Sequence, residues 1–221
     1  MPTALLIPVK NLSNAKQRLG EAFDQEHRSL LAEAMLRDVL TVAAGVADRL
    51  DLYLVTGDAQ ARRLRAAFGF GVIEDTRNES ETAAIEMATA WCEERGYDTA
   101  VVLPGDVPLT TSAELRRVLD SAPEEGAVFV PAYDRRGSNC ILRRPASIIP
   151  LRFGDDSFLP HLAAARAIGI EPVIVRLPGI GLDIDQPRDV QALLRAGPRM
   201  ATRAVRLLEV ATLAAPPPTL G

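Results

Sequence analysis

The sequence is poor in the residues that build disulfide frameworks and histidine-based metal centres. Its 221 residues include two cysteines, Cys92 and Cys140, and two histidines, His27 and His161. The cysteines lie too far apart for a CxxC redox pair or a cysteine zinc site, so we expect buried thiols. The two histidines are far apart in the sequence, so a serine triad or a histidine metal site would have to be built on a single imidazole. Nothing in the sequence supports hydrolysis through a nucleophilic serine.

Long apolar runs and an excess of positive charge are also absent. No stretch is long enough to cross a bilayer, and the formal net charge is −4. That charge gives no electrostatic footprint for binding a nucleic-acid polymer. The first residues lack the basic leader and small-residue cleavage site of a signal peptide. We therefore expect a cytoplasmic protein with neither a membrane nor a nucleic-acid polymer as partner.

Several familiar motifs are missing too. There is no GxxxxGK[ST] phosphate loop and no HExxH zinc motif. Residues 69–74 superficially resemble a dinucleotide fingerprint, but they follow a helical stretch and lead into an apolar run. That order is the reverse of what the fingerprint requires, so the segment is interpreted as a helix C-cap and strand entry.

What the chain does contain is an alternation of short apolar runs with stretches of helical period. The runs, which we expect to be strands, are residues 4–9, 52–56, 99–103, 127–131 and 172–177. Helical spacing is found at residues 36–43, 59–68, 82–94 and 112–119. Strands that are apolar throughout are expected where helices cover both faces. The pattern predicts an α/β fold, a three-layer sandwich with a mainly parallel, Rossmann-like sheet.

Two segments depart from this alternation. Residues 139–142 follow residues 127–131 so closely that no crossover helix fits, which predicts an antiparallel hairpin. Residues 1–198 are predicted to form one domain, and residues 199–213 a C-terminal amphipathic helix whose apolar face a second subunit could cover, as in a homodimer. Residues 214–221 are rich in proline and are expected to be a loose tail.

Three aspartates follow apolar runs where a ligand site is expected. Asp106 follows residues 99–103, and Asp183 and Asp185 lie near the end of the chain. In an open parallel sheet, ligands bind beyond the carboxyl ends of the strands. Asp183 and Asp185 are two apart in an extended segment, so their side chains share a face. Carboxylates gathered in this way suit Mg²⁺, although Asp185 could also cap the helix that follows it.

A polar loop after the first predicted strand carries three cations, Lys10, Lys16 and Arg18. A loop at the carboxyl edge of the sheet would face the same crevice as Asp106. Cations and metal could then divide a triphosphate between them, with these three side chains and Asp106 as the catalytic candidates. The alternative is a solvated loop, which is the common fate of an isolated Lys or Arg.

Taken together, these motifs resemble the guanylyltransferases that activate a small phosphorylated carboxylic acid in deazaflavin coenzyme biosynthesis. The resemblance spans roughly residues 5–194. It rests on Pro8-Val9-Lys10, Ala15-Lys16-Gln17-Arg18-Leu19, residues 34–40, Gly105-Asp106-Val107-Pro108-Leu109, Gly137-Ser138-Asn139, residues 153–158 and Leu182-Asp183-Ile184-Asp185-Gln186-Pro187. It implies the fold of the nucleotide-diphospho-sugar transferases. It also implies transfer of GMP from GTP to the acid's phosphate, with release of pyrophosphate.

The resemblance also implies roles for individual residues. Asp106, Asp183 and Asp185 would hold Mg²⁺. Ser138, Asn139, Gly154 and Ser157 would border the acid, which could be phosphoenolpyruvate, 2-phospho-L-lactate or 3-phosphoglycerate. Ser157 could instead cap a helix, and His161 one turn later could either orient the acid or lie on the surface.

One segment departs from the family. Where the family carries a Gly-rich turn and Leu-Asn before the third helix, this chain has residues 75–85, expected near the base and ribose. The choice of GTP therefore stays open. A cytidylyl- or molybdopterin-type nucleotidyltransferase and a non-catalytic nucleotide-binding regulatory module are the alternatives. The intact acidic residues argue against the module, because a pure binder has no need of a metal at the α-phosphate.

Overall fold

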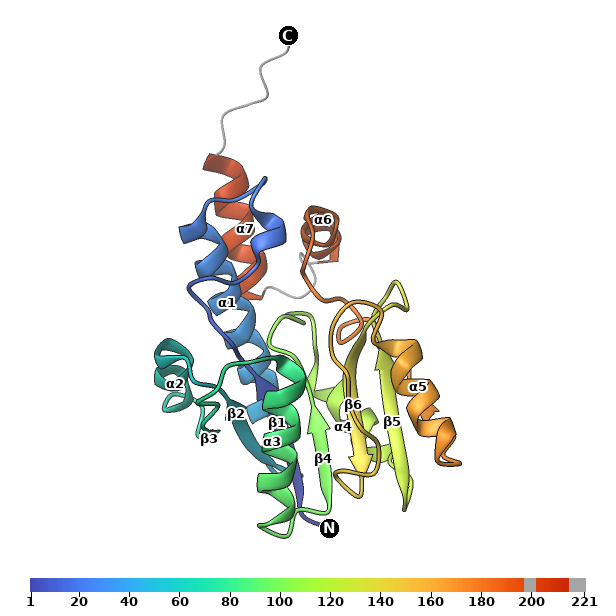
Figure 1. Ribbon diagram of the computed structural model, residues 1–221. Coiled ribbons are helices and arrows are strands. Elements are labelled where there is room, and N and C mark those ends of the chain that lie inside the picture. Colours follow the sequence, from blue (N-terminus) through green and yellow to red (C-terminus); the bar gives the residue numbers. More distant parts are fainter. Residues whose placement is uncertain (197–201, 215–221) are drawn as a thin grey trace.

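A sheet forms the middle layer of the protein, whose computed structural model describes residues 1–196 and 202–214. Within those residues the sheet has seven strands in the order β3-β2-β1-β4-β6-β5-β7 (Figure 1). The strands are β1 Thr3–Pro8, β2 Asp51–Val55, β3 Gly71–Ile73, β4 Thr99–Val102, β5 Gly126–Pro131, β6 Ser138–Arg144 and β7 Val173–Ile174. The helices are α1 Gln25–Ala44, α2 Ala59–Arg65, α3 Glu81–Glu93, α4 Ser112–Asp120, α5 Phe158–Ala167, α6 Pro187–Ala196 and α7 Arg203–Ala214, with a 3₁₀ turn at Gln17–Leu19.

Helices cover both faces of this sheet. On β1, Leu5 and Ile7 face one apolar core, which they share with α1, α2 and α4. Ala4 and Leu6 face the other core, which they share with α3 and α5. All four side chains are fully buried, as the period of two in a strand requires when both faces are covered. The three-layer α/β prediction is confirmed.

Strand β6 runs opposite to its neighbours. It pairs antiparallel with both β4 and β5, whereas the other strand pairs are parallel. The predicted hairpin is therefore confirmed. Because β6 is reversed, its first residues, Ser138 and Asn139, lie at the same edge as the carboxyl ends of β1 and β4. This brings polar residues from distant parts of the sequence to one edge of the sheet.

Strand β7 is much shorter than the predicted residues 172–177. It pairs only with β5, and its two residues, Val173 and Ile174, are 40% and 39% exposed. Val175 and Leu177 leave the sheet and enter the apolar core instead. Only Val173 and Ile174 of the predicted strand therefore form one, and these two residues are exposed.

Helix α7 is held against the domain by its own chain. Asp38 of α1 accepts hydrogen bonds from the N–H groups of Arg203 and Ala204, both at 2.9 Å, and so caps α7. Ala204 and Val205 are buried in a third core with α1 and α6. Part of the apolar face expected to be open to a second subunit is thus covered within the chain, whereas Val210 is 66% exposed. Residues 199–201 of the predicted helix and 215–221 of the predicted tail lie outside the described residues.

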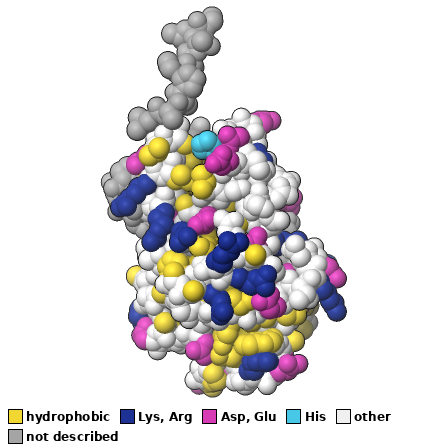
Figure 2. Space-filling model, turned by 90° about the vertical axis from the view of Figure 1, so that its left-hand side faces the viewer, with side chains coloured by type: hydrophobic (Ala, Val, Ile, Leu, Met, Phe, Trp, Pro, Cys, Tyr) yellow, Lys and Arg dark blue, Asp and Glu magenta, His cyan; other side chains and the backbone are white. Residues whose placement is uncertain are grey.

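The side of the molecule that carries α2 has mixed charge. Helix α2 contributes Arg62, Arg63 and Arg65, and Arg62 pairs with Glu74 at 3.1 Å. Figure 2 shows Lys and Arg side chains on this face interspersed with acidic and apolar ones. Among the described residues, no helix is both long and apolar enough to span a membrane.

Candidate active site

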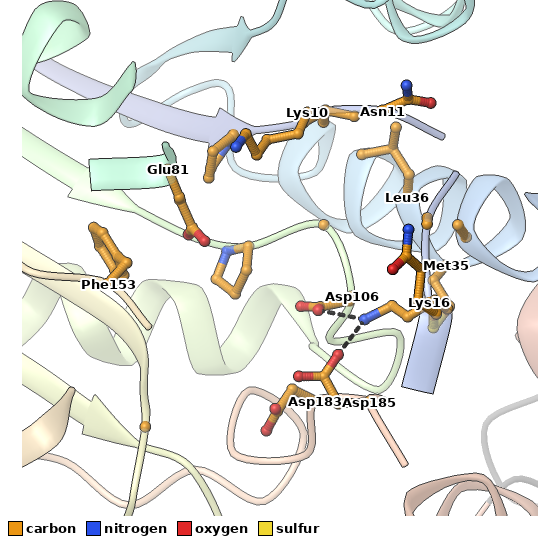
Figure 3. A pocket seen from close by; sticks show the side chains of 18 of the residues that line it. Lys10, Asn11, Lys16, Met35, Leu36, Glu81, Asp106, Phe153, Asp183 and Asp185 are labelled. Atoms are coloured by element: carbon orange, nitrogen blue, oxygen red, sulfur yellow. Dashed lines mark hydrogen bonds and ion pairs between the residues drawn. The ribbon is translucent and has the colours of Figure 1, made fainter. Parts of the chain in front are cut away.

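A cleft of about 860 Å³ opens at the edge where β1 and β4 end and β6 begins. This is where an open α/β sheet binds its ligands, and the volume falls in the range of nucleotide-sized sites. Lys10, Lys16, Arg18 and Asp106 all line it. The prediction that the cationic loop and Asp106 face one crevice is confirmed, and Figure 3 shows the arrangement of Lys10, Lys16 and Asp106.

Lys16 joins two of the predicted metal ligands. Its Nζ donates to Asp106 Oδ2 at 2.6 Å and to Asp185 Oδ1 at 2.7 Å, and its side chain is 8% exposed (Figure 3). The backbone of Lys16 is left-handed, with φ of 56°, at the start of the 3₁₀ turn. This turn aims the side chain back under the loop and into the cleft.

The ion pairs change the acid–base properties of these groups. Burial alone would lower the pKa of Lys16, but the charges and hydrogen bonds of Asp106 and Asp185 outweigh it and raise that pKa. Burial likewise works to raise the pKa of Asp185, yet Lys16 and, more weakly, Arg18 hold it below its usual value. The cluster is therefore a charged one at neutral pH.

Asp183 stands beside this cluster and is held by a neutral partner. Its Oδ1 accepts a hydrogen bond from Asn139 Nδ2 at 2.9 Å. Burial raises the pKa of Asp183 to about 6, the charge of Asp106 adds to the rise, and the Asn139 bond opposes it. Ile184, between the two aspartates, is fully buried and donates its N–H to Asp106 O at 3.2 Å. The predicted alternation is confirmed.

These carboxylates fit a divalent cation in part. Asp106 and Asp185 both reach one ammonium, so the same two side chains can reach one Mg²⁺, which prefers oxygen ligands. Asp183 lines the same cleft. In the described part of the chain, however, no three acidic, histidine or cysteine side chains already surround one point. Lys16 lies between the carboxylates instead. We call Lys16, Asp106, Asp183 and Asp185 the acidic wall.

The other two cations of the loop are held more loosely. Arg18 Nη2 lies 3.0 Å from Asp155 Oδ1, and both side chains are more than half exposed. Lys10 Nζ donates to the backbone oxygen of Glu79 at 3.1 Å. Neither contact is buried, so both side chains are able to turn toward a bound anion.

The opposite side of the cleft is neutral. Ser138 donates its N–H to Ser157 Oγ at 3.1 Å. The N–H of Arg152 donates to His161 Nε2 at 2.8 Å. Burial, assisted by the charge of Arg143, lowers the pKa of His161 to about 4, so its ring is neutral at pH 7. We name Ser138, Asn139, Ser157 and His161 the hydroxyl wall.

In the described part of the chain, these hydrogen bonds leave the hydroxyl hydrogens of Ser138 and Ser157 available. Because Nε2 accepts, the proton of neutral His161 lies on Nδ1 and is donated to Ser138 Oγ at 3.0 Å. Ser138 and Ser157 each accept one hydrogen bond and keep their own O–H hydrogens for a ligand. His161 is 1% exposed, so its surface interpretation is wrong.

Ser157 and Asn139 both line the cleft, and each has a partner that the sequence did not indicate. Ser157 is already helical and makes no side-chain cap, because its hydroxyl bonds to Ser138 instead. Both amide hydrogens of Asn139 are taken, one by Ile180 O and one by Asp183 Oδ1, each at 2.9 Å. The amide is thus not free to donate to an acid. Asn139 instead ties the hydroxyl wall to the acidic wall.

Gly154 lies where the two sides of the cleft meet. Its φ of 135° belongs to a region that residues with a side chain rarely adopt. The turn around it is fixed by the Phe153 N–H, which donates to Thr82 Oγ1 at 2.9 Å, and by Arg136 Nη2, which lies 3.0 Å from Asp156 Oδ2. The structure thus brings Gly154 to the cleft, as predicted.

Sequence reasoning missed one group in the cleft. Glu81, the first residue of α3, lines it. The only signal was that Glu81 falls within residues 75–85, the segment that departs from the family pattern.

Comparison with known proteins agrees with this geometry. The family described as "Guanylyl transferase CofC like" matches residues 3–210. The chain belongs to this family. It is 34% identical over 205 residues to a phosphoenolpyruvate guanylyltransferase of Rubrobacter xylanophilus, covering 89% of this chain and 96% of the relative. It is 29% identical over 197 residues to a 2-phospho-L-lactate guanylyltransferase of Methanothermobacter thermautotrophicus, covering 89% and 86%.

Solved structures share the fold of this guanylyl transferase family member. A protein of Desulfovibrio desulfuricans G20, described as a nucleotide-diphospho-sugar transferase, superposes with a TM-score of 0.78 at 20% identity, covering 96% of each chain. A nucleotidyl transferase of Methanothermobacter gives a TM-score of 0.61 at 17% identity, covering 90% of this chain and 98% of its own. At these identities the likeness establishes the nucleotidyltransferase fold, as predicted.

Proposed function

We propose that the protein transfers GMP from GTP to the phosphate of a small phosphorylated carboxylic acid and releases pyrophosphate. The acid is phosphoenolpyruvate, 2-phospho-L-lactate or 3-phosphoglycerate, and the product serves deazaflavin coenzyme biosynthesis. The observation that carries the proposal is the pairing of two unlike walls across one cleft. One wall is charged and suits a metal-bound triphosphate, and the other offers neutral donors suited to a second, anionic substrate.

The reaction needs no protein nucleophile. The acceptor's phosphate is already ionised at neutral pH, and one of its oxygens attacks the α-phosphorus of GTP in line. The bond to the bridging oxygen breaks, and pyrophosphate leaves with the electron pair. Catalysis then rests on positioning and on neutralising the charge of the departing group.

The cationic loop is assigned to the triphosphate. Lys10 and Arg18, whose present contacts are exposed, turn toward the β- and γ-phosphates. With a metal bound to the carboxylates, Lys16 would be free to donate to the phosphates instead. Bidentate and charge-assisted hydrogen bonds of this kind are the strong ones, and they grow as charge develops on the leaving group.

Asp106 and Asp185, with Asp183 as the third candidate, are assigned to Mg²⁺. Bound there, the ion would neutralise phosphate charge and make the α-phosphorus more electrophilic. The protein's own contribution is to hold two carboxylates close together, and Lys16 does this by contacting both.

The hydroxyl wall is assigned to the acid. Ser138 and Ser157 each offer an O–H hydrogen, and Gly154 offers close backbone approach without a side chain. His161 is a positioning residue, because it acts through the hydroxyl of Ser138. These small, neutral donors suit a carboxylate and a phosphate held at short range.

The test is a substrate panel. Purified protein is incubated with Mg²⁺, each of the four nucleoside triphosphates and each of the three acids, and pyrophosphate release is followed. We expect release only with GTP and with at least one acid. Turnover with CTP or ATP in place of GTP would mean a different nucleotidyltransferase, and no release in any well would favour a binding module.

A further inference from the structure

Glu81 is an acidic side chain of the cleft for which the proposed chemistry has no role. It is the first residue of α3 and is partly buried. Figure 3 shows its carboxylate pointing into the cleft, with Asp106 between it and Lys16 in this view. Asn78 and Pro104 also line the cleft.

The carboxylate of Glu81 differs from the others in having both oxygens available. The other acidic residues of the cleft already have protein partners: Asp106 and Asp185 with Lys16, Asp155 with Arg18, and Asp183 with Asn139. In residues 1–196 and 202–214, no hydrogen bond or ion pair ends at the Glu81 carboxylate. Burial raises its pKa to about 7, and the charges of Asp106 and Asp185 add to the rise. A ligand in the cleft can therefore donate hydrogen bonds to both oxygens of this carboxylate.

The backbone around Glu81 is fixed before any ligand binds. Asp75 is buried, and its Oδ1 accepts the Asn78 N–H at 2.9 Å. Ser80 caps α3 through a bond from the Ala83 N–H at 3.0 Å. A carboxylate on the first turn of a capped helix is a pre-organised acceptor.

Guanine presents the donors that such an acceptor needs. Its N1–H and its N2 amino group are adjacent, and one carboxylate accepts from both at once. Adenine has an acceptor at N1 and no N2 amino group. The acidic wall takes the phosphates and the hydroxyl wall takes the acid, which leaves the part of the cleft at Glu81 for the base.

We propose that Glu81 selects guanine by accepting hydrogen bonds from N1–H and N2–H of the base. This inference rests on the proposed function and names the residue that sets its nucleotide. It also gives a role to the segment that departs from the family pattern.

Titration calorimetry of nucleotides, without any acid present, tests Glu81 apart from turnover. Wild type should bind GTP tighter than ITP, which lacks the N2 amino group, and both tighter than ATP. Glu81→Gln keeps the shape of the side chain, but its amide nitrogen faces the guanine amino group. Affinity for GTP should fall about ten- to hundredfold, because the bond from the amino group is lost and the bond from N1–H no longer has a charged acceptor.

The same variant should gain affinity for XTP. Xanthine carries an oxygen at C2, which the glutamine amide can donate to while its oxygen accepts from N1–H. Glu81→Ala should lose the preference for GTP over ATP without gaining XTP. Glu94→Gln, an equal change of charge just beyond the far end of α3, is the control and should bind like wild type.

Equal losses for GTP, ITP and ATP in Glu81→Gln would overturn the inference, because they would place the carboxylate at the ribose or the phosphates. Unchanged GTP affinity would overturn it as well. Wild-type turnover is measured separately with GTP and the acids. Guanine selection by Glu81 without turnover would reject the proposed function alone, and turnover that is indifferent to Glu81 would reject the inference alone.

Discussion

The two walls of the cleft stabilise their polar side chains by different kinds of interaction. The acidic wall balances charge with charge, through one ammonium that contacts two carboxylates. The hydroxyl wall balances its polar groups with neutral hydrogen bonds between Ser138, Ser157 and His161. Charges in a cleft interact strongly and can be exchanged for other charges, whereas neutral bonds set orientation.

This difference predicts how large the effect of a substitution should be in each wall. On the acidic wall, removing one charge alters every neighbouring charge, so effects on turnover should be large. On the hydroxyl wall, removing one group costs about one hydrogen bond, so effects should be smaller and confined to the acid or to stability.

The largest effect is expected for Asp106→Asn. The amide keeps the size of the side chain but removes a charge, so the fold should persist while turnover falls about a hundred- to thousandfold. Asp48→Asn, which breaks an exposed pair with Arg116, is the control and should retain activity. Near-native pyrophosphate release by Asp106→Asn at limiting Mg²⁺ would remove Asp106 from the metal site.

Lys16→Met should separate the two roles assigned to this lysine, which are the contact with the carboxylates and the contact with phosphate. Without its ammonium, Asp106 and Asp185 repel each other, so the melting temperature should fall in the absence of Mg²⁺ and should rise more on adding Mg²⁺ than it does in wild type. Turnover should also fall, by about tenfold or more, because a phosphate contact is lost. A melting temperature that responds to Mg²⁺ as wild type does would contradict the exchange of Lys16 for metal.

His161→Phe tests, through the pH dependence of stability, whether His161 is held neutral in the hydroxyl wall. The pKa of His161 is about 4 in the folded protein, against 6.5 for an unperturbed histidine. The unfolded chain therefore binds the proton first, and the stability that His161 provides is complete above pH 6.5 and is lost as the pH falls toward 4. At pH 5 the loss is about 2 kcal/mol.

The free energy of unfolding of wild type minus that of His161→Phe should shrink by this amount between pH 7 and pH 5, measured by urea titration. Comparing the two proteins at each pH cancels the other titrating groups. Ser138→Ala keeps the imidazole and should keep the wild-type pH dependence. A difference that is constant with pH would mean that His161 is not held neutral.

Ser157→Ala should have the smallest effect. It removes the oxygen that accepts a hydrogen bond from the Ser138 N–H. It also removes the O–H group that donates to the acid, and each bond is worth on the order of 1 kcal/mol. The KM for the acid should rise roughly fivefold, with little change in the KM for GTP. An equal rise for GTP would move Ser157 away from the acceptor subsite.

Much of the fold followed from local patterns. The apolar runs at 4–9, 52–56, 99–103 and 127–131 became β1, β2, β4 and β5 because a strand buried on both faces must be apolar throughout. Pro187 opens α6, as its missing N–H allows. The hairpin followed from a connection too short for a helix.

The hydrogen-bond and ion-pair partners of individual side chains could not be predicted from the sequence. Lys16 and Asp106 are 90 residues apart, and sequence gave each a separate role on phosphate and on metal. Ser157 looked like a cap because capping is a local bond, yet its hydroxyl is used by Ser138, 19 residues away. The direction of Glu81 depends on how α3 packs. Such choices are made by tertiary structure, which a linear pattern does not contain.

The most direct test of the account follows the phosphorus and oxygen atoms. Phosphoenolpyruvate labelled with ¹⁸O in its phosphate is incubated with GTP, Mg²⁺ and the protein, and the products are analysed by ³¹P NMR and mass spectrometry. The account predicts a diphosphate that joins GMP to the acid with ¹⁸O in the bridge, together with unlabelled pyrophosphate. GDP, or pyrophosphate without a guanylylated acid, would contradict it.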